Sequence, residues 1–170
     1  MPKHLNFWEL SVKIVPFTPD YTEQVVDVIL TIQNTEFDIP ITRAQQPDLD
    51  NIPGYYQQGA GNFWVALEGE RVIGTISLLD IGNGQGALRK MFVNRDYRGG
   101  ERGVARQLLQ TLLDWARTHD YTEIFLGTTD KFKAAHRFYE KSGFIEVTAD
   151  VLPPAFPKMA VDNKFYKFTL

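Results

Sequence analysis

Apolar and polar positions alternate along the first half of the chain in a way that predicts a strand, a helix and a three-stranded meander. Residues 12–17 alternate as in a strand, and Pro16 favours a sheet edge because proline cannot donate a ladder hydrogen bond. An apolar face with helical spacing then continues to about Asn34. Turns that contain glycine separate three further apolar runs, which we expect to form consecutive strands, namely residues 63–67, 72–79 and 87–93.

Helical and strand patterns alternate in the second half of the chain. Residues 104–116 carry apolar side chains at helical spacing, and residues 131–141 predict a second helix, which Gly143 ends. Strands are expected at residues 124–126, 144–147 and 164–169. The resulting order, β-α-(α)-β-β-β-α-β-α-β-β, predicts a fold of the α+β or mixed α/β class, with a mixed sheet and helices on both faces.

Length and composition indicate one globular domain. The chain has 170 residues, and we expect residues 12–170 to form a single domain after an N-terminal extension at residues 1–11. No apolar run reaches the length of a signal peptide or a membrane span, so we expect a cytoplasmic protein without a membrane partner. The net charge of −3 argues against nucleic acid as a partner. The absence of cysteine excludes an acyl-cysteine intermediate, and three scattered histidines indicate no metal site.

A loop rich in glycine and arginine, residues 94–103, joins a predicted strand to the long helix. The first turn of a helix leaves backbone N–H groups unpaired, and the helix dipole adds partial positive charge there. Glycines allow a phosphate to approach the backbone closely, and Arg98, Arg102 and Arg106 can pair with its oxygens. A pyrophosphate would suit this loop, although a glycine-bearing turn at a solvated helix start is the simpler interpretation. The loop lacks the lysine of a Walker motif.

Two segments together resemble the GNAT superfamily of N-acetyltransferases. Residues 93–109 are similar to the acetyl-CoA loop of that family, and residues 135–144, Ala-His-Arg-Phe-Tyr-Glu-Lys-Ser-Gly-Phe, are similar to its A-x-x-x-Y-E-K-x-G-F segment. The resemblance covers nearly the whole chain. It implies a central, mostly antiparallel mixed sheet, acetyl-CoA as the cosubstrate with CoA as the product, and direct transfer of an acetyl group to an amine in a ternary complex.

The same resemblance implies which residues bind the cofactor. In the family, the loop amides hold the pyrophosphate, and the preceding strand pairs with the pantetheine arm and polarises the thioester carbonyl. The corresponding residues here are Met91, Phe92, Val93, Arg98, Gly99, Gly100, Arg102, Gly103, Val104, Ala105 and Arg106. The loop is two residues longer than the usual family pattern, so either Arg98 or Arg102 fills the family arginine position. An asparagine common in the family is replaced by Phe132.

Tyr139 matches the tyrosine that serves the family as general acid. A tyrosine with a reference pKa of about 10 is suited to protonate the CoA thiolate as it leaves. Helix periodicity alone would explain Tyr139 as a core residue. The attacking amine must be neutral, and at pH 7 only about one in a few thousand lysine-like amines is neutral, so a base is needed.

The base and the acceptor site are less defined by the sequence. Glu36 and Asp38 follow the first helix and are candidates for the base through water, although a solvated helix end also explains them. Arg89 and Lys90 occupy the strand before the loop, either as surface residues or as contacts to an acidic group on the acceptor. The irregular segment 37–61 forms either a wall over the site or a plain connection. The acceptor is expected to be a small-molecule or peptide amine.

Other functions and assemblies are compatible with the same residues. A longer acyl group or a hydroxyl acceptor is one alternative, and a CoA-binding sensor or scaffold without catalytic activity is another. A regulator that binds ATP through the loop is disfavoured by the missing Walker lysine. Phe165 and Tyr166 form either the seam of a homodimer or a buried final strand. His136 is expected to be exposed on its helix.

Overall fold

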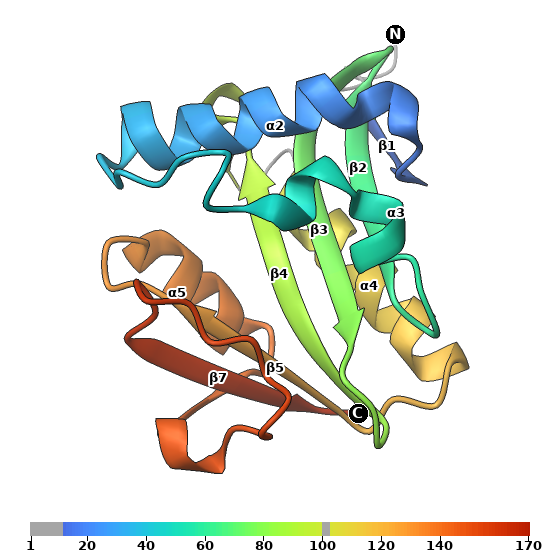
Figure 1. The fold of residues 1–170 in the computed structure, drawn as a ribbon, viewed down its shortest axis with the longest axis vertical. Helices are drawn as coiled ribbons and strands as arrows, with labels where there is room; N and C mark the ends of the chain where they lie inside the picture. Colours follow the sequence, from blue (N-terminus) through green and yellow to red (C-terminus); the bar gives the residue numbers. More distant parts are fainter. Residues whose placement is uncertain (1–11, 100–102) are drawn as a thin grey trace, which may run out of the picture.

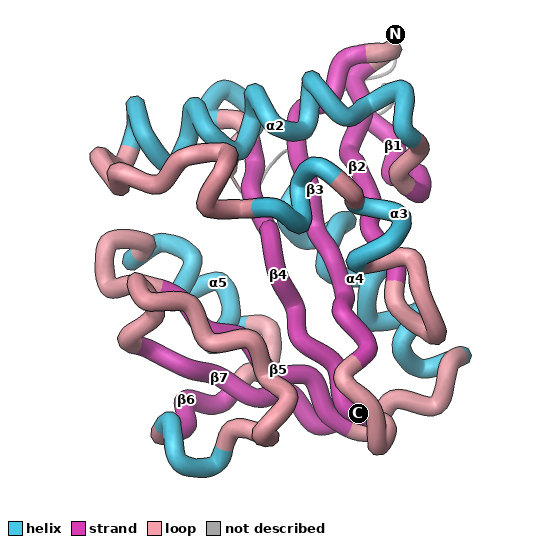
Figure 2. The backbone as a smooth tube through the Cα atoms, in the orientation of Figure 1, coloured by secondary structure: helices cyan, strands magenta, loops and turns pink. Residues whose placement is uncertain are grey.

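The computed structural model describes residues 12–99 and 103–170, and this part of the chain forms a seven-stranded sheet (Figures 1 and 2). The strand order is β1-β2-β3-β4-β5-β7-β6. The strands are β1 (Val12–Pro16), β2 (Asn62–Glu68), β3 (Arg71–Asp80), β4 (Gln85–Val93), β5 (Glu123–Thr128), β6 (Ile145–Val147) and β7 (Lys164–Thr169).

The α-helices of the described residues are α2 (Thr22–Leu30), α3 (Ile52–Tyr55), α4 (Val104–Thr118) and α5 (Lys133–Lys141). A π-helical segment, η2 (Thr31–Glu36), continues α2, and the short 3-10 helix η3 (Pro47–Asp50) precedes α3. Further 3-10 turns are η1 (Pro19–Tyr21), η4 (Arg95–Tyr97) and η5 (Ala149–Val151). None of the helices in the described ranges has the length and apolar character needed to cross a membrane.

The observed order of elements confirms the predicted fold class. Strand β1 lies at an edge of the sheet, as Pro16 indicated, and strands β1 to β4 pair in antiparallel fashion. Strands β4 and β5 pair in parallel, while β7 pairs in antiparallel fashion with both β5 and β6. The sheet of the described residues is therefore mixed and mostly antiparallel.

Strand β2 shows how the two faces of the sheet become buried. Successive side chains of a strand point to opposite faces. Phe63, Val65 and Leu67 pack in one apolar cluster with α2, while Trp64 and Ala66 pack in another with α4. Figure 1 shows α2 and α3 on one face of the sheet and α4 on the other. Each residue of β2 from 63 to 67 is buried, so this strand anchors both layers.

A β-bulge interrupts β4 at Lys90. Thr75 of β3 pairs with Phe92, but Ser77 pairs with Arg89, so β4 contains one residue more than its partner. Lys90 has a positive φ of 55°, which is rare for a residue with a side chain. The Thr75 hydroxyl donates to the carbonyl of Lys90 and the Ser77 hydroxyl to that of Arg89, both at 2.6 Å. These two buried hydroxyls satisfy carbonyls at the bulge and fix its position.

Strands β4 and β5 separate after a short pairing. Their register covers only residues 85–87 of β4 opposite residues 123–125 of β5. Beyond this pairing the two strands diverge, as Figure 1 shows. A bulge increases local strand twist. The bulge at Lys90 therefore lies where β4 turns away from β5, and this divergence opens the sheet beside the second half of β4.

The structure decides the position of Phe165 and Tyr166 and corrects that of His136. Phe165 and Tyr166 are 6% and 0% exposed, because β7 lies between β5 and β6. They form a buried final strand, so they do not support a dimer seam. His136 is buried rather than exposed, and its Nε2 lies 2.9 Å from the carbonyl oxygen of Thr129. This contact ties α5 to the end of β5, which helical periodicity alone could not indicate.

We expect Thr75→Val to destabilise the fold by removing one of the two hydroxyls that hold the bulge. Valine has nearly the same shape, but it leaves the buried carbonyl of Lys90 without this donor, which costs about 1–3 kcal/mol. Urea unfolding of the variant and of the parent protein measures the difference. Thr118→Val, at an exposed position of α4, is the control and should change stability by less than about 0.5 kcal/mol. Equal stability of both variants would contradict the role assigned to Thr75.

Candidate functional site

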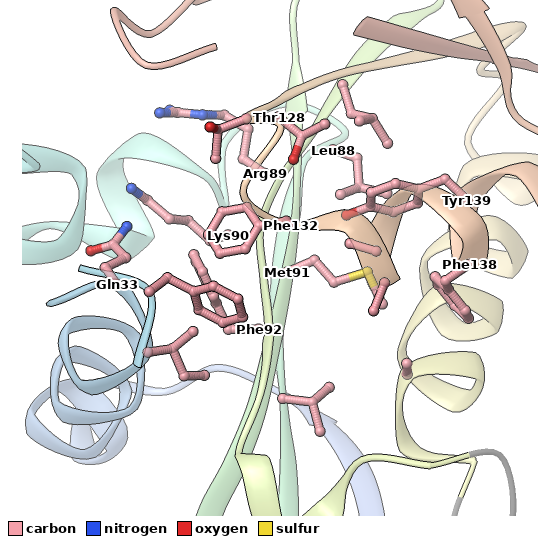
Figure 3. A pocket seen from close by; sticks show the side chains of 18 of the residues that line it. Gln33, Leu88, Arg89, Lys90, Met91, Phe92, Thr128, Phe132, Phe138 and Tyr139 are labelled. Atoms are coloured by element: carbon pink, nitrogen blue, oxygen red, sulfur yellow. The ribbon is translucent and has the colours of Figure 1, made fainter. Parts of the chain in front are cut away.

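A cavity of about 700 Å³ occupies the opening between β4 and β5. Its walls come from residues 88–93 of β4, the end of β5, the start of α4 and one side of α5, and from η2 on the opposite side. Figure 3 shows Tyr139 and Phe138 on one side of β4, and Arg89, Lys90 and Gln33 on the other. The cavity therefore has two chemically different ends, joined along β4.

The start of α4 forms one end of this cavity. Gly103 is the N-cap and has a φ of 66°, a left-handed conformation that suits glycine. Among residues 12–99 and 103–170 no side chain caps this helix start, and no acidic residue lies in its first turn, so the N–H groups of the first turn remain suited to an external anion. A Cβ at position 103 would lie 2.9 Å from Nη2 of Arg106, so this guanidinium lies close beside the N-cap.

The residues predicted to bind the cofactor around this loop do not all line the cavity. Gly99, Gly103, Ala105 and Arg106 line the cavity, whereas the side chain of Val104 is buried in the apolar core. Gly100 and Arg102 lie outside the described residues. The choice between Arg98 and Arg102 as the family arginine therefore stays open, as do the cofactor-binding roles predicted for this loop.

Arg98 is held by contacts within the protein. Its Nε donates to the carbonyl of Val93 at 2.9 Å, and its two terminal nitrogens form a bidentate ion pair with Glu36. The guanidinium also lies 5.8 Å from the ring centre of Phe37. This ion pair joins the end of η2 to the loop before α4. Glu36, a candidate base, is thus engaged with a cation.

Asp38, the other candidate base from the sequence, is exposed and has a φ of 54°. It does not line the cavity, and its carbonyl accepts a hydrogen bond from Lys131 at 3.3 Å. Phe132, beside that lysine, packs edge-to-face against Phe37 at 4.8 Å between ring centres and against Phe92 at 6.3 Å. The loop before α5 and the loop after η2 therefore meet across the cavity.

The second half of β4 supplies backbone groups to the cavity. Met91, Phe92 and Val93 all line it, and β5 does not pair with this part of the strand. The carbonyl of Val93 is already bonded to Arg98. The predicted pairing of this segment with a pantetheine arm therefore depends on the remaining backbone groups of residues 91–93 and stays a prediction.

Tyr139 of α5 is 6% exposed and lines the cavity from the side opposite Arg89. Its ring packs at 5.5 Å from Phe144 and at 6.0 Å from Tyr166, between ring centres. Figure 3 shows its hydroxyl directed into the cavity. Burial raises the pKa of Tyr139 above its ordinary value, so the hydroxyl remains protonated at neutral pH. Tyr139 is thus a core residue and a cavity residue at once.

Arg89 and Lys90 are not surface residues, because both line the cavity. A regular strand would direct neighbouring side chains to opposite faces, but Figure 3 shows both cations on the same side of β4. The bulge at Lys90 accounts for this arrangement. The ammonium of Lys90 donates to Oε1 of Gln46 at 2.6 Å and lies 3.5 Å from Oδ2 of Asp48.

Several polar residues around this end were not identified from the sequence. Gln33 and Gln46 exchange hydrogen bonds at 3.1 and 2.9 Å, and the hydroxyl of Tyr56 donates to Asp48 at 2.6 Å. Asp162 lines the cavity, and burial raises the pKa of its carboxyl. Gln33 lies near the end of the predicted helix, and the others lie in segments without a clear periodicity, so only their three-dimensional contacts distinguish them. The segment 37–61 is thus a wall of the site, as one of its two interpretations held.

Known proteins share both the sequence pattern and the fold. The family model described as acetyltransferase (GNAT) family matches residues 26–144. An acetyltransferase of the GNAT family from Staphylococcus aureus Mu50 has a crystal structure with a TM-score of 0.89 and 38% identity, covering 93% of this chain and 98% of that chain. The PaiA N-acetyltransferase of Thermoplasma acidophilum, crystallised with coenzyme A, shares the fold at a TM-score of 0.72 and 14% identity, covering 94% of this chain and 99% of that chain.

A curated relative is the N-acetylaspartate synthetase of Xenopus tropicalis, which is 37% identical over 130 residues. The match covers 73% of this chain but 46% of that protein, so the chain spans about half the length of this relative. The matches confirm the predicted superfamily and the predicted fold class.

The position of Lys90 predicts an unusual dependence of stability on pH. Burial lowers the pKa of Lys90 to about 8 from 10.5, so the folded protein releases this proton near pH 8 while the unfolded chain retains it to about pH 10.5. Below pH 8 the buried charge lowers the free energy of unfolding by its full amount. This penalty decreases as the pH rises from 8 and is lost by about pH 10.5.

Lys90→Met removes this titration, since methionine carries no charge. We expect the free energy of unfolding of the parent protein, relative to that of the variant, to rise by about 3 kcal/mol between pH 8 and 10.5. Urea unfolding at several pH values measures this difference. A difference that is constant over the whole range would contradict the assigned burial of the Lys90 ammonium.

Proposed function

The chain belongs to the GNAT family of acetyltransferases, and we propose that residues 12–170 transfer an acetyl group from acetyl-CoA directly to an amine within a ternary complex. The family uses acetyl-CoA as its cosubstrate, and this chain forms an acetyl-CoA-dependent N-acetyltransferase domain. The observation that carries the proposal is the single cavity that connects the start of α4, the open edge of β4 and the buried Tyr139. We propose this activity for the whole protein as well as for the domain.

The cavity fits acetyl-CoA by its chemistry. The uncapped start of α4 suits the pyrophosphate, with the backbone amides of Gly103, Val104 and Ala105 and the side chain of Arg106 as its ligands. The edge of β4 at residues 91–93 suits the extended pantetheine arm, since an extended chain can pair with an open strand. Acetyl-CoA supplies the activated thioester, and the protein supplies its orientation.

Asp162 is our candidate for the group that collects the proton of the attacking amine. Within residues 12–99 and 103–170 it is the one carboxyl that lines the cavity. Burial raises its pKa, which brings the carboxylate closer to the basicity that suits a general base near neutral pH. The carboxylate also accepts the backbone N–H of Met159 at 2.9 Å, which limits its motion. Glu36 is less suited because Arg98 holds it.

Tyr139 is our candidate for the general acid. In the transfer, the amine nitrogen forms a bond to the acetyl carbon, the carbon–sulfur bond breaks, and the electron pair leaves with the sulfur. The hydroxyl of Tyr139 gives a proton to the thiolate, and solvent later returns one to the phenolate. Its raised pKa keeps the hydroxyl protonated at neutral pH, so a proton is present when the thiolate forms.

The proposal also covers the acceptor, the cellular compartment and the oligomeric state. The acceptor is an amine, and we propose a small molecule because residues of the segments 37–61 and 156–162 form part of the cavity wall at the end of Arg89 and Lys90. The relative named N-acetylaspartate synthetase makes free amino acids the first acceptors to test. We further propose a cytoplasmic enzyme. The homodimer loses its one sequence argument with the burial of Phe165 and Tyr166.

Tyr139→Phe is expected to lower kcat by a factor of about 100 or more while the affinity for acetyl-CoA stays within about twofold, because only the proton donor is removed. Thiol release measures kcat and calorimetric titration measures the affinity. Tyr166→Phe is the matched control, since its hydroxyl is bonded to Glu140 at 2.6 Å outside the cavity and its loss should leave kcat unchanged. Binding of acetyl-CoA without turnover of any amine by the parent protein would favour the sensor or scaffold alternative.

Asp162→Asn keeps the shape of the side chain and its acceptor for Met159 but removes the base. We expect kcat/KM to fall by a factor of about 100. The parent protein should lose activity as the pH falls through the raised pKa of Asp162, because the protonated carboxyl cannot accept the amine proton. The variant should lack this acid limb in its pH–rate profile. An unchanged acid limb would remove Asp162 from the proposed mechanism.

A further inference from the structure

The positive charge of Arg89 is incompletely compensated within the cavity wall. Its guanidinium donates to the hydroxyl of Tyr55 at 3.0 Å and to the sulfur of Met159 at 3.4 Å, which is a weak acceptor. It also lies 5.6 and 5.9 Å from the ring centres of Tyr55 and Tyr56. No ion pair within 4 Å joins Arg89 to a carboxylate of the described residues.

Arg89 is partly buried, and partial burial of a guanidinium is unfavourable unless a partner supplies negative charge. Contacts with aromatic faces compensate part of the free energy lost when the guanidinium is dehydrated. A neutral hydroxyl and a thioether, however, do not neutralise its charge. The planar fork of an arginine fits a carboxylate through two parallel hydrogen bonds. The guanidinium of Arg89 thus has no carboxylate ion-paired with it among the described residues, and it lines the cavity, where a ligand carboxylate could bind it.

Lys90 adds a second cation on the same side of β4 (Figure 3). Its side chain is 6% exposed, and the partners that hold it are Gln46 and Asp48. The carboxylate of Asp48 also accepts from the hydroxyl of Tyr56, so it is shared between two donors. Asp162 influences both cations electrostatically but forms no ion pair with either in the described part of the chain. Two neighbouring cations therefore face this end of the cavity with one ion-paired carboxylate between them.

We propose that the acceptor amine belongs to a molecule that also carries a carboxylate, and that Arg89 and Lys90 bind this carboxylate. The inference rests on the proposed function and adds the chemical class of the acceptor. Anchoring the carboxylate at the cationic end directs the amine toward the middle of the cavity, beside residues 91–93 and opposite Tyr139. The same two charges repel amines that carry a second cation, so the site selects amino acids over polyamines.

The ionisation of Lys90 is compatible with this role. With a pKa of about 8, the ammonium is mostly charged at pH 7, and a bound carboxylate would favour the charged form further. The hydrogen bond that the ammonium donates to Oε1 of Gln46 and the ion pair with Asp48 keep it in position before the acceptor arrives. The buried cations are thus preorganised for a ligand that brings the opposite charge.

The test compares each acid with its own amide. Initial rates of thiol release at saturating acetyl-CoA are measured for aspartate, glutamate, alanine and β-alanine, each paired with the carboxamide that lacks the charge. Phosphoethanolamine and spermidine extend the panel to a phosphate and to a polycation. We expect kcat/KM for the preferred acid to exceed that for its amide on the order of 100-fold, as for other buried charge pairs. The amides have the more easily deprotonated amine, so their lower activity cannot arise from the nucleophile.

The variants assign the discrimination to the two cations. Arg89→Gln and Lys90→Met should each raise KM for the acid and bring its kcat/KM close to that of the amide, with the affinity for acetyl-CoA retained. Arg89→Lys should recover part of the loss, because it restores the charge without the fork. Arg117→Gln on the exposed end of α4 and Lys167→Met on β7, which pairs with Glu123, are matched controls that should leave the acid-to-amide ratio unchanged. Calorimetric binding of acetyl-CoA shows that each variant is folded.

The failure of this inference and that of the proposed function give different results. Equal rates with acids and amides, a preference for spermidine or phosphoethanolamine, or an unchanged ratio in both variants would overturn the carboxylate assignment while transfer itself stands. Absence of acetyl-CoA binding and of turnover with every amine of the panel would overturn the proposed function, and the carboxylate assignment with it.

Discussion

The left-handed conformation of Lys90 is the constraint on which the other features of the site depend. It adds a residue to β4 that β3 cannot match, and the hydroxyls of Thr75 and Ser77 satisfy the carbonyls at this point. The extra residue directs two successive cations to one side of the strand and lies where β4 leaves β5. A regular β4 would direct one of these cations toward the opposite side, to which α4 packs.

The cavity combines elements that are distant in sequence and different in chemistry. The helix start at Gly103 and the guanidinium of Arg106 lie at one end of the cavity, and the phenol of Tyr139 lies in an apolar surrounding. On the other side of β4, the irregular segments between α2 and β2 and before β7 provide the polar wall around Arg89 and Lys90. Regular elements thus position the end of the cavity proposed for the reaction, while irregular segments form most of the wall at the end proposed for the acceptor.

The sequence was sufficient for most of the fold and for several of the residues that line one end of the cavity. Apolar periodicity located the meander, α4 and α5, and the loop before α4 combined with the segment around Tyr139 indicated the family. The bulge breaks the alternation of β4 at a single point, and one break within a short strand is not a recognisable sequence pattern, so Arg89 and Lys90 resembled surface residues. The Glu36–Arg98 ion pair joins residues 62 positions apart, and Asp162 follows a proline-rich stretch without a pattern, so both required the tertiary structure.

The Glu36–Arg98 ion pair has a consequence for communication between the two ends of the cavity. Arg98 belongs to the loop that leads into α4, and Glu36 ends the helical segment that carries Gln33 in the polar wall. Occupants of the two ends are therefore mechanically connected through one bidentate contact. A ligand that moved Arg98 would also disturb Glu36 and the end of η2 through this contact. Any resulting change of affinity at one end of the cavity would be matched by an equal change at the other, because coupling between two binding sites is reciprocal.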